Sequence, residues 1–427
     1  MGGRRIGGRL ARLALKGAGA AIALAVAAQS AQAQDAGSAP QASAVEGWDE
    51  LLDSLRDLPD RMLAKLPEHM RSDPQIRAEI GRIALAALTS SSLEALGGDP
   101  MAPTFLPSIG QVLDIGQPNA DTVYRTASVD STEDYRISGQ AGTITLAVIA
   151  QVVPGSNTRP HLDLSTLTVD DKGRFSVLVS AQRPDDYEGD FWQLEPGTRR
   201  LMMRLVSSDW AGEVQPVVTI ERVSGPMGRP RSSAADLTAR LKALPGETGF
   251  IASLFVDRVE KLAAEGYVNR FRTMVPPMGA LESQFYYDGV FDLKDDEALI
   301  VESDVPANCR YRSLILTNGL YETIDWTNNH SSLNAAQAAP DSDGRLRIVV
   351  SAKDPGVRNW LDTAGYTRGI IQGRWTGCDS QPVPTLTKVK LAQVRQALPD
   401  DVATVTPEER DALVRERSRA YQARALW

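Results

Sequence analysis

The chain has 427 residues, of which 42% are hydrophobic and 23% are charged, and its formal net charge is −8. This composition is typical of a globular protein, and the acidic balance argues against a general nucleic-acid binder, which needs a basic surface. Three histidines and two cysteines exclude a structural zinc ribbon, a four-cysteine iron–sulfur cluster and a histidine-rich metal centre. We therefore expect no cofactor and assign no metal ligands.

The first 33 residues have the three parts of a secretory signal peptide. Residues 1–16 carry five basic and no acidic side chains, and residues 17–28 form a short apolar stretch. Ala31-Gln32-Ala33 fits the cleavage site that follows. The apolar stretch is too short to span a membrane, and no later segment offers about 20 consecutive apolar residues. These features predict export to the bacterial periplasm or beyond, with no transmembrane anchor in the mature protein.

The rest of the chain alternates between helical and β-rich regions. Apolar residues recur at helical spacing between residues 46 and 98, whereas later regions show period-two alternation and short apolar runs separated by Gly, Pro, Asn and Asp. Ser233 is suited to cap one helix, and Thr406 with Glu409 forms a capping box for the last one. The predicted domains are a signal peptide (1–33), a linker and helical segment (34–100), a first β-sandwich (101–230), a helical connector (231–280), a second β-sandwich (281–395) and a C-terminal helix (396–427).

The two β-rich regions resemble each other in sequence. GRFSVLVSAQRP (173–184) aligns with GRLRIVVSAKDP (344–355) without gaps, and six of the twelve positions are identical. A slightly shorter loop then brings Trp192 onto Trp360. The alternative is two unrelated strand–turn units that share common β residues. We expect a mainly β fold with flanking helices, built as two tandem jelly-roll-like antiparallel sandwiches from an internal duplication, with a cleft or broad face between them.

Cys309 and Cys378 are the two cysteines of the chain, and both lie in the second β-rich region. In an oxidising compartment an even pair of cysteines favours a disulfide. The alternative is two separate buried thiols. We predict the disulfide.

Residues 300–395 contain the strings RYRSLILTNGLYETIDW, SDGRLRIVVSA, DPGVRNWLDTAG and RWTGCDSQPVP. This region resembles the DUF1214 family, and NADTVYRTASVD upstream is similar to a strand of its partner domain, DUF1254. The resemblance implies a jelly-roll β-sandwich and does not imply a particular chemistry. Asp362 stands where the family often has proline, so a shared role of that turn does not carry over.

Common catalytic motifs are missing from the sequence. It contains no G-x-S-x-G elbow, no phosphate-binding GxxxxGK[ST], no Rossmann glycine pattern and no HExxH. These absences disfavour an α/β-hydrolase, a kinase, a dehydrogenase and a zinc protease. Candidate function therefore depends on polar clusters.

The segment from Asp325 to Asn334 is the densest polar cluster. Trp326 offers a flat apolar face for stacking, and Asn329 and Asn334 can hydrogen-bond hydroxyl groups of a substrate. His330 can act as a general base if a carboxylate orients its ring. The alternative is a surface loop whose polar side chains bond to their own backbone.

A second cluster supplies the remaining predicted site residues. Asp362 is the candidate acid, base or partner of His330, and Trp360 is a candidate stacking wall. Arg374 could neutralise a developing oxyanion. The alternatives are a buried tryptophan that repeats the packing of Trp192, and an interstrand salt bridge of Arg374.

Two further groups have simpler interpretations. Asp341 and Asp343 precede a glycine and fit a hairpin turn, although a calcium site there stays open. The NADTVYR segment fits a strand-entry turn in which Tyr124 could also line a shared cleft.

These features lead to one functional expectation and one alternative. We expect an exported, cofactor-independent lyase or hydrolase that acts on a hydroxylated small molecule of aromatic, lipid-like or saccharide type. The alternative is a non-catalytic envelope protein that binds a ligand or a protein partner through a jelly-roll face. The fold itself cannot decide between them.

Overall fold

The computed structural model describes residues 43–153, 160–226, 228, 230–274, 281 and 284–425. The described residues from Val45 onward form one compact unit. The predicted signal peptide, its cleavage site and most of the predicted linker lie outside the described residues. Within the described ranges, none of the helices has the length and apolar character needed to cross a membrane.

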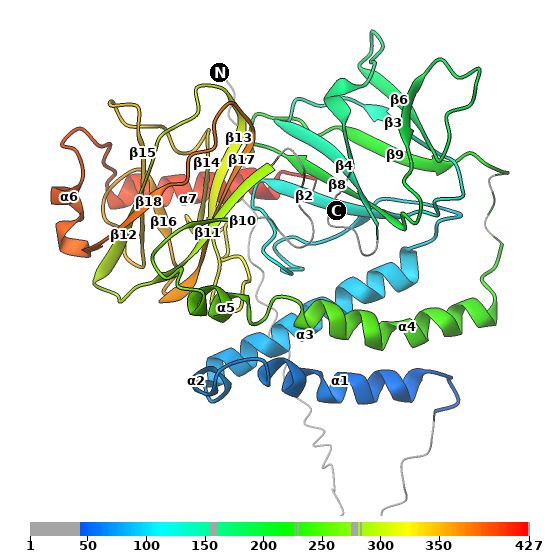
Figure 1. Ribbon diagram of the computed structural model, residues 1–427, viewed down its shortest axis with the longest axis horizontal. Helices are drawn as coiled ribbons and strands as arrows, with labels where there is room; N and C mark the ends of the chain where they lie inside the picture. Colours follow the sequence, from blue (N-terminus) through cyan, green and yellow to red (C-terminus); the bar gives the residue numbers. More distant parts are fainter. Residues whose placement is uncertain are drawn as a thin grey trace, which may run out of the picture. The chain divides into compact units, whose positions relative to one another are not determined.

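The helices form at local sequence signals. Asp73 caps α3 and accepts a hydrogen bond from the backbone of Gln75, and Pro74 occupies its first turn. The capping boxes at Ser233 and Thr406 begin α4 and α7, which confirms both predicted helix starts. Helices α1, α3 and α4 pack against one another (Figure 1). The bounds are α1 (Trp48–Leu63), α2 (Glu68–Arg71), α3 (Pro74–Gly97), α4 (Ala234–Ser253), α5 (Arg258–Ala264), α6 (Val394–Ala397) and α7 (Pro407–Gln422).

The first β-rich region forms two packed sheets, which we call the N-terminal sandwich. Its five-stranded sheet has the order β1-β2-β8-β4-β5, and its four-stranded sheet has the order β7-β6-β3-β9. Alternating side chains from both sheets fill a shared core that includes Ile137, Val177 and Leu201. The strands are β1 (Leu106–Pro107), β2 (Thr122–Ser128), β3 (Tyr135–Gln140), β4 (Leu146–Val152), β5 (His161–Asp163), β6 (Arg174–Ser180), β7 (Asp190–Gln193), β8 (Arg200–Val206) and β9 (Val217–Arg222).

The second β-rich region forms the C-terminal sandwich. Its sheets have the orders β10-β11-β17-β13-β14 and β16-β15-β12-β18. They enclose a second core that includes Phe291, Leu316 and Val350. The strands are β10 (Arg272–Met274), β11 (Gln284–Asp292), β12 (Glu297–Ser303), β13 (Cys309–Leu316), β14 (Ser332–Asn334), β15 (Leu346–Ser351), β16 (Trp360–Asp362), β17 (Arg368–Cys378) and β18 (Thr385–Lys390). The predicted fold of two β-sandwiches with flanking helices is confirmed.

The two sandwiches have the same strand order. Adding nine to each strand number of the N-terminal sandwich gives the order of the C-terminal one. One parallel pair occurs in each, β6 with β7 and β15 with β16, where the sequence had suggested purely antiparallel sheets. The turn before each of these pairs is also shared. Gly173 and Gly344 have positive φ values of 72° and 82°, and their amides donate to Asp170 and Asp341. This agreement supports the internal duplication.

The ladder register corrects one detail of the predicted alignment. Val179 and Val350 occupy matched positions, and they lie opposite Trp192 and Leu361, respectively. Trp192 therefore corresponds to Leu361, and Trp360 lies one position away from the match. A shift of one residue turns a strand side chain to the other face of the sheet. Trp192 accordingly packs on the sandwich core, whereas Trp360 packs outside it against α6.

The two five-stranded sheets contact each other through their outer faces. Leu146, Val148 and Val206 of the N-terminal sandwich cluster with Tyr311 of the C-terminal one. Asp121 sits beside this cluster and accepts hydrogen bonds from the Tyr311 hydroxyl at 2.6 Å and from the Trp210 indole at 2.8 Å. The region between the sandwiches thus contains side chains from both.

Candidate functional site

His330, the predicted general base, is buried and engaged within the C-terminal sandwich. It is 8% exposed, and its Nδ1 contacts the carbonyl oxygen of Trp360. Burial, together with nearby Arg417, lowers the pKa of His330 to about 3. The imidazole is therefore neutral at physiological pH.

Asp362 contacts His330 through the backbone and not through its carboxylate. Its amide donates to the carbonyl of His330 at 2.9 Å, while its carboxylate accepts from the amide of Ala364 at 2.7 Å. Burial raises the pKa of Asp362. In the described part of the chain no hydrogen bond joins the His330 and Asp362 side chains, so the predicted catalytic pairing is not present in this structure.

The predicted binding residues of the same region also serve internal contacts. Trp326 packs edge-on against Tyr421 at 6.0 Å, and Trp360 stacks on His330 at 6.5 Å. The Asn329 side chain donates to the carbonyl of Asp325 at 3.1 Å. Asn334 donates to Asp121 at 2.8 Å. The Asn329 contact fits the alternative of a loop bonded to its own backbone, whereas Trp326 and Asn334 are buried and Asn334 bonds to a distant residue. Any role of these side chains in binding stays a prediction.

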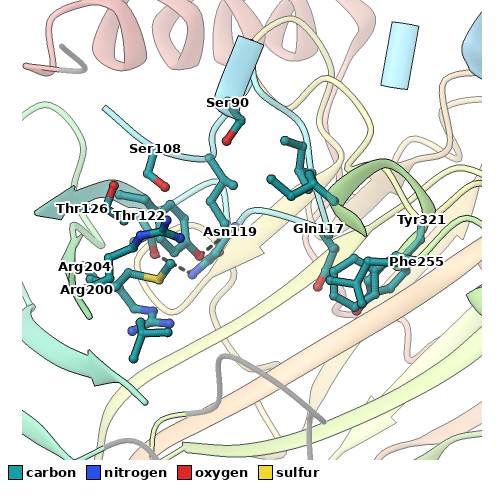
Figure 2. A pocket seen from close by; sticks show the side chains of 18 of the residues that line it. Ser90, Ser108, Gln117, Asn119, Thr122, Thr126, Arg200, Arg204, Phe255 and Tyr321 are labelled. Carbon is teal, nitrogen blue, oxygen red and sulfur yellow. Dashed lines mark hydrogen bonds between the residues drawn. The ribbon is translucent and has the colours of Figure 1, made fainter. Parts of the chain in front are cut away.

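Arg374 lies elsewhere, in a cavity of about 390 Å³ between the two sandwiches. Strands β2 and β8 line it from the N-terminal sandwich, β11 and β17 line it from the C-terminal sandwich, and α3 and α4 contribute further residues. Figure 2 shows part of this lining, including Thr122 of β2, Arg204 of β8 and Gln117. This volume is within the usual range for small-molecule sites. Among the lining residues, the apolar ones are Leu93, Leu106, Pro107, Ile109, Ile115, Val152, Met202, Val206, Phe250, Ile251, Leu254, Phe255 and Met274.

A tyrosine–arginine pair from each sandwich lines this cavity. Tyr124 on β2 lies opposite Arg204 on β8, and Tyr286 on β11 lies opposite Arg374 on β17. Each guanidinium lies over the ring of its own tyrosine, at 6.0 Å in the first pair and 5.8 Å in the second. The two pairs stand at different positions of the repeat, because the register that matches Val179 with Val350 places Gln372, and not Arg374, at the position of Arg204. Tyr124 therefore does line a shared cleft.

The deepest polar contact of the cavity joins Arg374 to Gln117. Arg374 Nη2 donates to Gln117 Oε1 at 3.2 Å, and the two residues are 5% and 4% exposed. Arg374 Nη1 and Gln117 Nε2 are buried donors without a hydrogen-bond partner. Within the described residues, no carboxylate lies within salt-bridge distance of Arg374. An uncompensated buried guanidinium is unfavourable unless something supplies an acceptor.

Further polar groups line the wall formed by the C-terminal sandwich. The Tyr321 hydroxyl donates to Gln372 Oε1 at 2.8 Å, and the Tyr286 hydroxyl donates to Gln284 Oε1. The amide nitrogens of both glutamines make no hydrogen bond with the described residues. They are therefore available to an acceptor inside the cavity.

The rim of the cavity carries charges of both signs. Arg200 on β8 pairs with Glu94 on α3 at 3.5 Å. Glu247 on α4 also lines the cavity, and partial burial raises its pKa. Phe250, one helical turn further on, is 57% exposed. The opening therefore lies at α3 and α4, while Arg374 and Gln117 lie deep inside.

Sequence reasoning found Arg374 and Tyr124 but did not connect them, and it missed Gln117, Arg204 and Tyr286. The duplication carried no signal for them, because the tyrosine–arginine pairs stand at different positions of the two copies and Gln117 lies before β2.

Comparisons with known proteins support the family resemblance and the fold. Residues 291–369 match the family model described as "Protein of unknown function (DUF1214)". This confirms the resemblance of the C-terminal region, while the resemblance to DUF1254 stays a prediction. The search of curated proteins found no match.

The solved structures that resemble this chain include two from bacteria. The crystal structure of an uncharacterized protein from Burkholderia cenocepacia is 26% identical, with a TM-score of 0.75, and the match covers 82% of this chain and 98% of that one. A protein from Vibrio parahaemolyticus is 13% identical, with a TM-score of 0.43, over 73% of this chain and 98% of that one. The first likeness extends the fold assignment to most of the chain.

Proposed function

We propose that this protein binds a small amphipathic organic anion in the cavity between its two sandwiches. The observation that carries this proposal is the pair of buried, unpartnered donors, Arg374 Nη1 and Gln117 Nε2. The two oxygens of a carboxylate can accept from both, because Arg374 and Gln117 are already hydrogen-bonded to each other. The apolar residues around them suit a hydrophobic body attached to that carboxylate.

Binding is favoured over catalysis by the chemistry of the lining. The described residues that line the cavity include no histidine and no cysteine. His330, with its pKa lowered to about 3, is poorly suited to accept a proton at neutral pH. Lyase or hydrolase activity therefore stays a prediction, and ligand binding is the function that we propose.

We also propose that the protein acts outside the cytoplasm. The Cys309–Cys378 disulfide is present, as predicted, and disulfides are typical of oxidising compartments. The signal-like composition of residues 1–33 supports the same location. Intact-mass measurement of protein purified from the cell envelope should find residues 1–33 removed, and a mature protein that retains Met1 would contradict export.

The test of ligand binding compares wild-type protein with Arg374→Gln. Sodium octanoate should bind to the wild type in isothermal titration calorimetry, and 1-octanol should bind more weakly because it carries no charge. Arg374→Gln should weaken octanoate binding by at least about 30-fold, the loss expected when one partner of a buried charged hydrogen bond is removed. Arg56→Gln is the control, because Arg56 lies exposed on α1 in a pair with Asp53.

Stability without ligand separates a binding role from a structural one. An unpaired buried charge destabilises a fold, so Arg374→Gln should unfold at the same temperature as the wild type or a higher one. Octanoate binding that is unchanged in Arg374→Gln would refute the proposal. A variant that melts well below the wild type would show that Arg374 instead supports the fold.

A further inference from the structure

The hydroxyl of Tyr124 is a third donor that faces the cavity. It accepts a hydrogen bond from the backbone amide of Asn119 at 3.1 Å, and it donates to no residue that the structure describes. Because Tyr124 lines the cavity, its hydrogen can be given to a bound ligand. Arg374 Nη1 and Gln117 Nε2 are the other two donors. The three come from β2, from β17 and from the loop before β2, so they approach a ligand from different elements.

The loop before β2 holds Gln117 in a conformation that residues with a side chain rarely adopt. Gly116 and Gln117 both have positive φ, at 65° and 61°. Such a conformation persists only where the surrounding structure fixes it, and it is enriched at binding sites. Here it accompanies the contact of the Gln117 side chain with Arg374. The position of the Gln117 donor is therefore set by the fold before a ligand binds.

Two buried guanidinium groups lie close enough to influence each other's charge. Arg204 is 7% exposed and, like Arg374, lines the cavity. Burial lowers the pKa of Arg204, and the positive charge of Arg374 acts in the same direction. Burial also acts to lower the pKa of Arg374, but interaction with Tyr124 and other tyrosines outweighs it and raises the pKa. Two cations that repel each other in an enclosed space favour a ligand with two negative charges.

We infer that the ligand is a phosphate monoester, a tetrahedral dianion with an apolar group on its fourth oxygen. Its three terminal oxygens accept from Arg374, Gln117 and Tyr124, and Arg204 balances the second negative charge. Arginine is suited to this role because its planar donors match the oxygens of a phosphate. The apolar group extends toward Phe250 at the opening. This inference rests on the proposed function, and it adds the chemical class of the ligand.

The first experiment compares three ligands that carry the same octyl chain. Nonanoate has two terminal oxygens and one charge, octyl sulfate has three oxygens and one charge, and octyl phosphate has three oxygens and two charges at pH 8. In isothermal titration calorimetry with wild-type protein, octyl phosphate should bind at least about tenfold more tightly than either of the others, the contribution of one further charged hydrogen bond. Octyl phosphate that binds no more tightly than nonanoate or octyl sulfate would overturn the inference.

A change of pH removes the second charge of the ligand and leaves its shape unchanged. A phosphate monoester loses its second proton at about pH 6, so at pH 5 only about a tenth of it is the dianion. The preference of wild-type protein for octyl phosphate over octyl sulfate should therefore fall about tenfold between pH 8 and pH 5. Glu94 and Glu247, the carboxyl groups among the described lining residues, act on both ligands, so the ratio of the two Kd values isolates the ligand's own charge. An unchanged ratio would overturn the inference.

Two variants separate the roles of charge and geometry. Arg204→Gln should reduce the preference for octyl phosphate over octyl sulfate. Tyr124→Phe should weaken the binding of both tetrahedral ligands relative to nonanoate by about fivefold, the loss of one hydrogen bond. Arg56→Gln, an exposed change on α1, is the control and should leave all three Kd values unchanged. Thermal unfolding checks that the variants fold, and unchanged preferences in either folded variant would overturn the inference. If neither variant folds, the pH comparison on wild-type protein decides.

The outcomes separate this inference from the proposed function. If none of the three ligands binds to wild-type protein, the proposed function fails. If nonanoate binds in a way that depends on Arg374, but octyl phosphate gains nothing over it, the proposed function stands and the assignment of a phosphate monoester fails.

Discussion

The two sandwiches share strand order, a parallel pair in the four-stranded sheet and a glycine turn, and each contributes a tyrosine–arginine pair to the cavity at a different position of the repeat. They differ in the residues around that pair and in the disulfide, which belongs to the C-terminal sandwich. The duplicated features define the scaffold, and each sandwich contributes its own side chains to the cavity between them.

This comparison shows how a repeated fold can build an asymmetric site. A strand fixes where its side chains point, so both copies direct an arginine into the space between them. Each copy also contributes different neighbours of its arginine to the cavity, Met202 from β8 and Gln372 from β17. Four predictions test how far the two halves are equivalent.

The largest effect should come from the disulfide, which has no counterpart in the N-terminal sandwich. Cys309 and Cys378 lie opposite each other on β13 and β17 and are 69 residues apart in sequence. In the chain-entropy model, a loop of this length contributes about 4 kcal/mol. The double variant Cys309→Ser/Cys378→Ser should lose about that much free energy of unfolding in urea denaturation. A loss below about 1 kcal/mol would mean that the bridge adds little to the C-terminal sandwich.

The second prediction concerns Glu322, a buried carboxyl of the C-terminal sandwich. Burial raises the pKa of Glu322 to about 7, although Arg82 lies 2.7 Å away. Between about pH 4.5 and 7, the Glu322 carboxyl is therefore protonated in the folded state and ionised in the unfolded state. Its contribution to stability, about 3 kcal/mol, is present below pH 4.5 and is lost as the pH rises through 7. The free energy of unfolding, measured across this range, should fall more steeply with pH in the wild type than in Glu322→Gln.

His330 acts with the opposite sign in the same measurement. Because its pKa is lowered to about 3, its contribution is present above pH 6.5 and is lost as the pH falls toward 3. Both proteins contain His330, so its contribution cancels when the free energy of unfolding of Glu322→Gln is subtracted from that of the wild type. Parallel pH profiles for the two proteins would contradict the raised pKa of Glu322.

The third prediction uses a matched pair of core residues. Val179 and Val350 occupy equivalent ladder positions, and both are 0% exposed. Each valine-to-alanine change should cost about 2 kcal/mol, because each removes a similar volume from a similar core. If the two sandwiches unfold together, urea denaturation shows a single transition, and both variants lower its midpoint equally. Two separate transitions, each moved by one variant, would show that the halves unfold independently.

The smallest effects are expected at the shared turn. Gly173 and Gly344 both have positive φ, and no atom lies within 4 Å of the position that a Cβ would take. Gly173→Ala and Gly344→Ala should therefore cost only the backbone penalty of about 1 kcal/mol each. Thermal unfolding should show two small, equal decreases. A larger decrease in melting temperature for one variant would mean that its turn tolerates an added Cβ atom less well than the other turn does.

Local patterns in the sequence predicted much of the fold. The identities between GRFSVLVSAQRP and GRLRIVVSAKDP pointed to the repeat, because both segments form the same turn and strand. Thr406 and Glu409 marked a helix start because a capping box requires residues only three positions apart. The alignment of Trp192 with Trp360 was wrong by one position, since two tryptophans on opposite faces look alike in a one-dimensional comparison.

The sequence by itself determined the elements that depend on near neighbours: strands, helix caps, the glycine turns and the repeat. The tertiary structure alone decided which polar residues have partners. Asn334 looked suited to binding, yet it donates to Asp121, which lies 213 residues away. Arg374 looked suited to a salt bridge, yet it meets Gln117, 257 residues away, and keeps an unpartnered donor. Burial and partners depend on contacts between distant segments, and those contacts form only when the two sandwiches come together.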